Sequence, residues 1–183
     1  MSRRALPLAL SPTALAALAT LLLLGTPEPL WAWGPTTHAW LGSQVLGNLG
    51  VLPLVIRELL AAHPYQYLYG SLSADITLAK RYVHFSRHCH NWTIGYEILD
   101  RATTPPLKAF ALGYLSHLAA DTIAHNVFVP RRLVATPYTR NVGHTYWEYR
   151  FDRAHDEQYL RLAREVVMMD HAEPDALLEQ VLT

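Results

Sequence analysis

The sequence predicts an all-α fold, on three observations. Apolar residues recur at helical spacing along most of the chain. No alternation of apolar and polar residues persists long enough to indicate a sheet. Prolines stand where several helices are expected to begin, as at Pro53, Pro105 and Pro174. With 183 residues, of which 51% are hydrophobic, the chain suits one helical domain with a core of its own.

Residues 1–32 are predicted to be a signal peptide. Two arginines near the start precede an apolar run over residues 14–24, and Ala32 is a small residue at a suitable cut site. A membrane anchor is the alternative, but the run falls short of the roughly 20 residues that span a bilayer. We therefore expect a secreted or periplasmic protein, cut after Ala32, whose mature domain of residues 33–183 begins at Trp33.

Helices are expected in order along the mature domain, each from apolar periodicity and a capping or proline signal. A connection near Asp75 is expected after Gly70, and a loop over residues 128–143, which hold two prolines and three arginines. The last helix reaches Thr183 with no capping signal, which is typical of a chain shortened at its C-terminus. The expected helices begin at Thr36 or Thr37 and then cover Pro53–Ala62, Ile76–His84, Trp92–Ala102, Leu107–Val127, His144–Met169 and Pro174–Thr183.

The charge balance and the cysteine count exclude several classes of protein. Fifteen basic and fifteen acidic side chains give a formal net charge of zero, without the electrostatic footprint of a protein that binds duplex nucleic acid. The single cysteine, Cys89, cannot build a disulfide scaffold. The surplus is in histidine, with ten residues that all lie at or after His38. Histidine is the common transition-metal ligand and the usual general acid or base.

The most apolar helix carries His117, Asp121 and His125, and a later helix carries His144 and Glu148. Residues four apart lie about 40° apart on one helical face, so each helix can direct neighbouring donors to a shared metal ion. An unpaired carboxylate in so apolar a helix would be strongly unfavourable. The pattern therefore predicts a metal site, and the alternative is a structural network of His–Asp hydrogen bonds.

Asp75 precedes three histidines, His84, His88 and His90, that surround Cys89. Asp75 suits either the N-cap of a helix or a metal ligand that pairs with one of these histidines. Cys89 can itself be a ligand with His88 and His90, although three adjacent donors give poor geometry. The residues alone leave these alternatives open.

These motifs together resemble one known family. The segment Trp33-Gly34-Pro35-Thr36-Thr37-His38 directly after a signal peptide, followed by the donors above, resembles the bacterial zinc-dependent phospholipase C family. It is also similar to the fungal single-strand nucleases that share a three-zinc, all-helical architecture. The resemblance extends from Trp33 to Glu148 and implies a helical bundle with a buried trinuclear zinc site, whose ligands are Trp33, His38, Asp75, His90, His117, Asp121, His125, His144 and Glu148.

The same resemblance divides these ligands among three zinc ions. Trp33, through its free amino group and its carbonyl, holds one zinc with His38, and Asp121 bridges that zinc to a second. His90 is preferred over His84 and His88 because its 15-residue separation from Asp75 is closest to the family's. The other ligands are Asp75, His90 and His117 for the second zinc, and His125, His144 and Glu148 for the third.

The implied activity is phospholipase C-like hydrolysis of phospholipid headgroups by a metal-activated water, with Asp75 as the catalytic residue that orients or deprotonates the water. Arg131, Arg132 and Arg140 are candidates for gripping phosphate oxygens. The expected partner is a phospholipid or another phosphodiester, with transient contact to a membrane surface. The alternatives are a three-zinc single-strand nuclease, against which the neutral charge argues, and a non-catalytic zinc-stabilised module.

Overall fold

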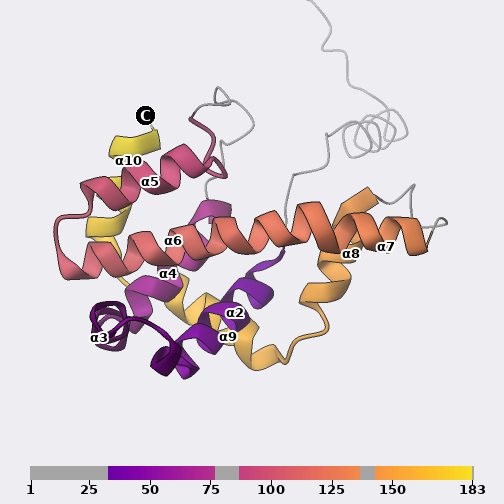
Figure 1. Ribbon diagram of the computed structural model, residues 1–183, viewed down its shortest axis with the longest axis horizontal. Helices are drawn as coiled ribbons and strands as arrows, with labels where there is room; N and C mark the ends of the chain where they lie inside the picture. The colour runs from indigo at the N-terminus through magenta and orange to yellow at the C-terminus, as the bar shows by residue number, and fades with distance from the viewer. Residues whose placement is uncertain (1–32, 77–86, 137–142, 183) are drawn as a thin grey trace, which may run out of the picture. The chain divides into compact units, whose positions relative to one another are not determined.

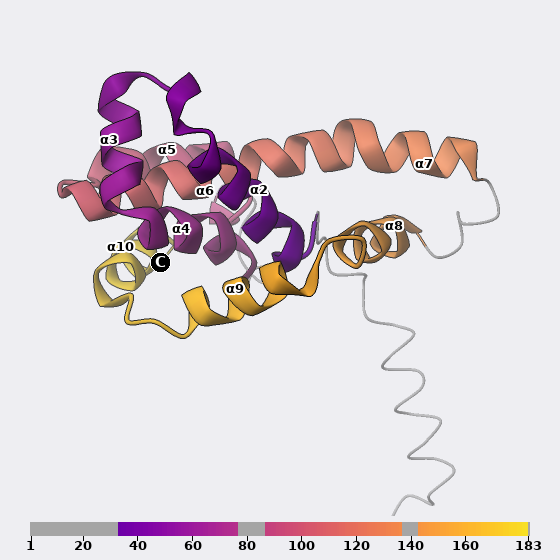
Figure 2. The ribbon, with the colours of Figure 1, turned by 90° about the horizontal axis from the view of Figure 1, so that it is seen from below.

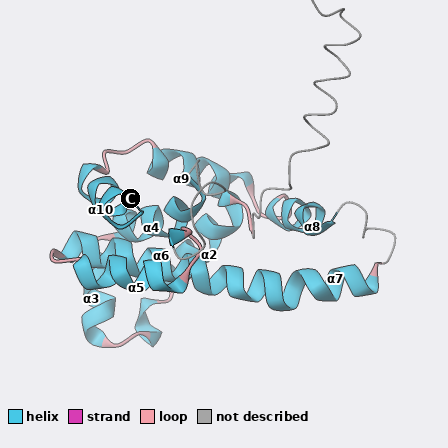
Figure 3. Cartoon of the chain, turned by 90° about the horizontal axis from the view of Figure 1, so that it is seen from above, coloured by secondary structure: helices cyan, strands magenta, loops and turns pink. Residues whose placement is uncertain are grey.

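The computed structural model describes residues 33–76, 87–136 and 143–182. The described part is helical and contains no strand, which confirms the predicted all-α bundle (Figure 3). Residues 31–183 form one compact unit. The described helices are α2 (Pro35–Gly47), η1 (Leu49–Val51), α3 (Leu54–Ala62), α4 (Pro64–Ile76), α5 (Trp92–Arg101), α6 (Pro105–Ile123), η4 (Ala124–Phe128), α7 (Val129–Ala135), α8 (Gly143–Asp152), α9 (Glu157–Val167) and α10 (Ala172–Leu182).

The most extensive contact between helices joins α4 to α6, which lie side by side in Figures 1 and 2. Two glycines make this contact close. A Cβ atom at Gly70 would overlap the carbonyl oxygen of Phe110, and one at Gly113 would overlap the carbonyl oxygen of Tyr67. The two backbones therefore touch directly, with no side chain between them at the crossing.

The core surrounds this pair of helices. One cluster of buried apolar side chains draws on α4, α5, α6, α9 and α10. Phe110, Tyr114 and Leu118 repeat at helical spacing along the buried face of α6. Capping side chains define where two of the helices begin, since Asn91 accepts a hydrogen bond from the Thr93 N–H at the start of α5, and Thr104 accepts one from Leu107 at the start of α6.

The long rod formed by α6, η4 and α7 in Figures 1 and 2 is not α-helical throughout. Residues Ala124–Phe128 form a π-helical turn, in which each hydrogen bond spans one residue more than in an α-helix. Pro130, which has no N–H to donate, lies two residues after the end of this turn. The extra residue in this turn changes the face of the rod on which the residues from the turn onward lie, and His125 is one of them.

Three predictions about the elements were wrong. The connection expected near Asp75 is the last turn of α4, so Asp75 is not an N-cap. Part of the expected loop over 128–143 is the helix α7. The helix expected over 144–169 is two helices, because the Asp156 side chain caps a new helix by accepting a hydrogen bond from the Gln158 N–H.

The helix expected over residues 76–84 lies almost wholly outside the described residues. Within the described part, none of the helices combines the length and the hydropathy that a bilayer-spanning helix requires.

Candidate metal centre

Asp121 lies at the centre of a cluster of histidines from three separate segments. Its Oδ1 atom is 3.3 Å from Nε2 of His38, which lies in α2. Its Oδ2 atom is 3.3 Å from Nε2 of His90 and 3.3 Å from Nε2 of His117. The two oxygens of one carboxylate thus face different histidines.

Asp75 joins this cluster from the end of α4. Its Oδ1 atom lies 3.2 Å from Nε2 of His90, and Nε2 of His90 lies 3.1 Å from Nε2 of His117. Donor atoms lie within 4.8 Å of one another in the group His38, Asp75 and His117, and again in the group His90, His117 and Asp121. The α4–α6 crossing therefore carries a carboxylate from each helix into one cluster.

The donor set and its spacing fit zinc. Four donors at about 2.0–2.1 Å from a tetrahedral zinc ion lie about 3.3 Å from one another, close to the separations found here. The 3.3 Å contacts lack hydrogen-bond alignment, so both oxygens of Asp121 and Nε2 of His38 are buried without a hydrogen-bond partner among the described residues. Buried polar atoms without partners are unfavourable unless a cation binds them.

The backbone carbonyl of Ser71 determines the tautomer of His117. Its Nδ1 atom lies 3.0 Å from the carbonyl oxygen of Ser71, which can only accept a hydrogen bond. Nδ1 therefore carries a proton and donates it, which in the neutral ring leaves the lone pair on Nε2, the atom that lies 3.3 Å from Oδ2 of Asp121. The ring is also stacked on that of His38, with centroids 3.9 Å apart.

The segment that carries His90 is held to α6. The Tyr114 hydroxyl donates a hydrogen bond of 2.5 Å to the carbonyl oxygen of Cys89, and Sγ of Cys89 lies 3.3 Å from Nδ1 of His90. These contacts orient the His90 ring so that Nε2 is directed toward Asp75 and Asp121.

The electrostatics of the metal-free cluster favour a cation. Burial alone would raise the pKa of Asp121, but the neighbouring imidazoles of His117 and His38 outweigh it and hold the pKa well below its ordinary value. Burial lowers the pKa of His117, but the carboxylates of Asp121 and Asp75 and the Ser71 carbonyl raise it overall. Burial, with repulsion from His117, lowers the pKa of His38.

His125, His144 and Glu148 form a second, looser group. Nδ1 of His125 lies 3.9 Å from Oε1 of Glu148, and the rings of His125 and His144 have centroids 5.9 Å apart. Glu148 is buried, and Nε2 of His144 is buried without a hydrogen-bond partner in the described part. The group is not among those described residues whose donors all lie within 4.8 Å of one another.

The π-helical turn explains why His125 belongs to the second group and not to the cluster around Asp121. The sequence predicted that His117, Asp121 and His125 share one face, but only the first two lie in α6. His125 lies in η4 and is directed to Glu148 of α8 instead.

Trp33 lies just before α2 and is buried. Its ring stacks on Phe151 at 5.1 Å between centroids and meets Phe128 edge to face at 6.2 Å. It also lines the same cavity as His38 and His117. The residue expected to begin the mature domain is therefore next to the cluster that it is predicted to complete.

The alternatives near Cys89 are placed as follows. His88, Cys89 and His90 also bring donor atoms within 4.8 Å of one another. The His88 ring lies 5.6 Å from that of His90, whereas His90 contacts both carboxylates. His84 lies outside the described residues.

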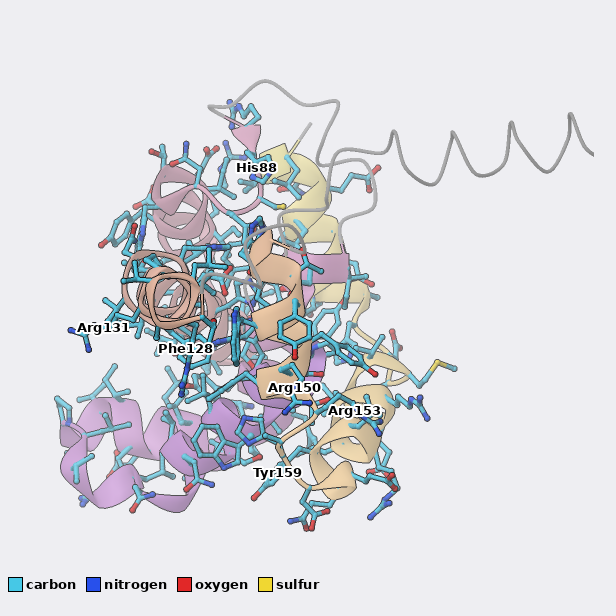
Figure 4. All side chains as sticks on the ribbon, turned by 90° about the vertical axis from the view of Figure 1, so that its right-hand side faces the viewer. His88, Phe128, Arg131, Arg150, Arg153 and Tyr159 are labelled. Carbon is cyan, nitrogen blue, oxygen red and sulfur yellow. The ribbon has the colours of Figure 1, made fainter. Side chains whose placement is uncertain are left out.

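The arginines expected to grip phosphate are placed only in part. Arg132 lies over the rings of Phe128 and Trp147, at 5.3 and 5.5 Å, and Arg131 projects from α7 away from the neighbouring helices (Figure 4). Arg140 lies outside the described residues.

Sequence reasoning missed three residues that position the cluster: Ser71, Tyr114 and Asp152. Ser71 acts through its backbone carbonyl, which no side-chain pattern reveals. The Asp152 carboxylate accepts hydrogen bonds from the N–H and the hydroxyl of Thr37, the residue before His38. Asp152 lies four residues after Glu148 in α8, so helical spacing was a signal that pointed to it.

Comparison with known proteins decides the family. One family, described as zinc-dependent phospholipase C, matches residues 37–180. The chain belongs to the zinc-dependent phospholipase C family. The match covers the helices that carry the cluster, from α2 to α10. No curated protein and no solved structure matches the chain.

Membership in the zinc-dependent phospholipase C family identifies the metal and the broad chemistry. The histidine and carboxylate groups of the cluster are donors that zinc accepts, and the family is one of zinc-dependent hydrolases. A zinc-dependent phospholipase C-like function is therefore shown for this chain.

Proposed function

We propose that this chain is a three-zinc hydrolase that cleaves the headgroup phosphodiester of phospholipids and releases diacylglycerol. The observation that carries this proposal is the position of Asp121, whose two carboxylate oxygens face different histidines. That placement supports Asp121 as the bridge between two zinc ions. The second group, His125, His144 and Glu148, would hold a third ion.

Zinc bound by these donors supplies Lewis-acid stabilisation of the charge that develops on the phosphodiester and lowers the pKa of water. Asp75 lies at the end of α4, and 11% of its side chain is exposed against 8% for Asp121, so it is slightly the more accessible of the two carboxylates. Asp75 orients the attacking water and takes its proton as the new O–P bond forms. The P–O bond to glycerol breaks, and the diacylglycerol oxygen leaves with a proton from solvent.

The proposal includes export and maturation. Removal of residues 1–32 would make Trp33 the first residue and free its amino group as a ligand. The burial of Trp33 against Phe128 and Phe151, beside His38, supports this role. The location would be secreted or periplasmic.

Contact with a lipid surface is proposed at α7 and α8. Val134 of α7 and Tyr149 of α8 are 73% and 63% exposed, and the same two helices carry Arg131 and Arg150, which Figure 4 labels. Exposed apolar and basic side chains together suit the interface of a bilayer with anionic lipids. Sedimentation with anionic vesicles tests this contact, and binding that is unchanged in Val134→Asp/Tyr149→Asp argues against it.

The proposed activity is tested with two substrates. The zinc-loaded protein should hydrolyse a chromogenic phosphocholine ester, lose this activity with a chelator and regain it with zinc. Cleavage of single-stranded DNA instead would favour the nuclease. Failure to cleave either substrate, with zinc bound, would favour a module that keeps zinc for stability.

Intact-mass and metal analysis of the exported protein tests the metal assignment separately. A chain that begins at Trp33 and carries about three zinc ions is expected, because the free amino group is a ligand in this proposal. A chain that begins elsewhere and still binds all its zinc would contradict the role of Trp33.

A further inference from the structure

A cavity of about 590 Å³ lies between α2 and α6, with η1 contributing to its wall. Its volume falls in the range of about 300–1,000 Å³ that is typical of small-molecule sites. The wall is mostly apolar, with Leu41 and Val45 from α2 and Ala120 and Ile123 from α6. Among the described residues, no acidic side chain, lysine or arginine lines it.

The cavity reaches from solvent to the candidate metal centre. Val51 and Ile123 in its wall are 85% and 53% exposed, whereas His38 and His117 are buried. Asp75, His90 and Asp121 are not part of the wall. A molecule in the cavity would therefore lie beside the two histidines without contacting the carboxylates.

We propose that this cavity binds one hydrocarbon chain of a lipid. The wall is apolar along its length and carries no charged side chain that could pair with a charged ligand. An uncharged, elongated and apolar group therefore matches it. The choice of a lipid as the source of this chain rests on the proposed function, because phospholipids carry such chains beside their phosphodiester. Chain binding itself needs no catalysis and is measured independently.

The experiment uses the exported, zinc-loaded protein and a series of linear alcohols from hexanol to decanol, which carry no phosphate. Binding is measured by titration calorimetry. Each buried methylene should strengthen binding by about fourfold until the cavity is full. Affinity that does not rise with chain length would overturn the proposal.

Two variants locate the binding, each with a matched control. Ala119 lies in the wall at an exposed position, so Ala119→Phe fills the cavity without burdening the core. Ala61→Phe makes the same change at an exposed position on α3 outside the wall. Decanol binding should weaken by about tenfold or more in Ala119→Phe and stay unchanged in Ala61→Phe.

The second pair introduces a charge at the solvent end. Val51→Asp should also weaken decanol binding by about tenfold, whereas Val55→Asp, at an exposed position outside the wall, should leave it unchanged. Binding that is equal in each variant and its control would overturn the proposal. Dimerisation through this face, seen by analytical ultracentrifugation and abolished by Val51→Asp, would assign the cavity to a second copy and overturn it too.

The failure of this proposal and that of the proposed function are distinguishable. In Ala119→Phe, KM should rise more for a long-chain phospholipid than for a phosphocholine ester without acyl chains. A protein that binds decanol with the expected chain-length dependence but hydrolyses no phosphodiester would keep the cavity's assignment and contradict the proposed function.

Discussion

Asp152 at the end of α8 caps the first turn of α2 through Thr37, which lies 115 residues earlier. Its Oδ1 atom accepts hydrogen bonds from the Thr37 N–H at 2.8 Å and from the Thr37 hydroxyl at 3.0 Å. The N-cap residue, Gly34, has no side chain to do this, and a Cβ atom there would lie 2.5 Å from Cγ of Asp152. The next residue after Thr37 is His38, so α8 holds the turn that carries a candidate ligand.

Asp152→Ala should therefore lower both stability and zinc affinity. Loss of the cap is expected to reduce the free energy of unfolding by about 1–2 kcal/mol. Asp152→Asn keeps an oxygen that accepts hydrogen bonds, so its effect should be smaller. Urea unfolding and zinc content measure the two effects, with the exposed Asp100→Ala as the control. Equal stability of Asp152→Ala and Asp100→Ala would show that the contact contributes nothing.

Asp75→Asn should abolish turnover and leave most of the zinc bound. An asparagine oxygen can still act as a ligand, but the amide cannot take a proton from water. Removal of a general base typically costs about 10²–10⁴-fold in rate. The measurement is kcat for the phosphocholine ester alongside zinc content, with Asp100→Asn as the matched control. Unchanged kcat in a fully zinc-loaded Asp75→Asn would remove Asp75 from the mechanism.

Gly70→Ala and Gly113→Ala should each destabilise the fold, because a methyl group would overlap the backbone of the facing helix. Forced overpacking costs about 1–3 kcal/mol, and a clash with backbone belongs at the upper end of that range. Gly47→Ala is the control, since a Cβ atom there meets nothing within 4 Å, and it should be neutral or stabilising. Thermal unfolding separates them, and a Gly70→Ala variant as stable as Gly47→Ala would contradict the close crossing.

Tyr69→Phe should destabilise the chain at neutral pH and less so at alkaline pH. The Tyr69 hydroxyl donates a hydrogen bond of 2.5 Å to Oδ1 of Asp175, and such a bond to a charged group contributes about 1.5–3 kcal/mol. Burial, with the Asp175 hydrogen bond and charge, raises the pKa of Tyr69. The folded chain thus holds the phenol proton more tightly than the unfolded chain. This stability is complete below about pH 10 and is lost as pH rises toward the folded-state pKa.

The difference in unfolding free energy between the unmodified protein and Tyr69→Phe should therefore shrink above about pH 10. Tyr67 and Tyr114, whose pKa values burial also raises, are present in both proteins and cancel in this comparison. A difference that is constant from pH 7 to 11 would contradict the role of the phenol proton.

Zinc affinity should fall as pH falls, beginning above the ordinary histidine pKa of about 6.5. Burial lowers the pKa of His117, but Asp121 and its other neighbours raise it overall, so a proton competes with zinc for Nε2 at higher pH than for an ordinary histidine. Competition with a chelator of known affinity at each pH measures this. An affinity that is constant from pH 8 to pH 6 would contradict the prediction.

The elements that the sequence predicted well are those with local signals. Apolar periodicity and proline placed α3 and α6 within a residue or two of their observed starts, and helical spacing joined His117 to Asp121. The break between α8 and α9 was missed, although residues 152–157 hold only one apolar side chain, Ala154, and Asp156 is a suitable cap. The π-helical turn carries no residue signature, so the position of His125 could not be predicted from α-helical spacing.

The parts of the candidate site that the sequence could not predict depend on contacts between distant segments. Thr37 and Asp152 meet only because α8 returns to the start of α2, and the Ser71 carbonyl acts through the backbone. The proximity of Asp75 to Asp121 depends on a helix crossing that two glycines permit. A glycine within a helix does not indicate which other helix packs against it.

The crossing at Gly70 and Gly113 also affects which substitutions this domain can accept during evolution. Because the two backbones touch, the separation of α4 and α6 does not depend on the volume of any side chain between them. Substitutions elsewhere in the core can alter packing, and even stability, without changing the spacing of the two carboxylates that these helices carry. A lineage can thus replace most of its apolar interior and keep the same spacing between Asp75 and Asp121, as long as these two positions stay without a side chain.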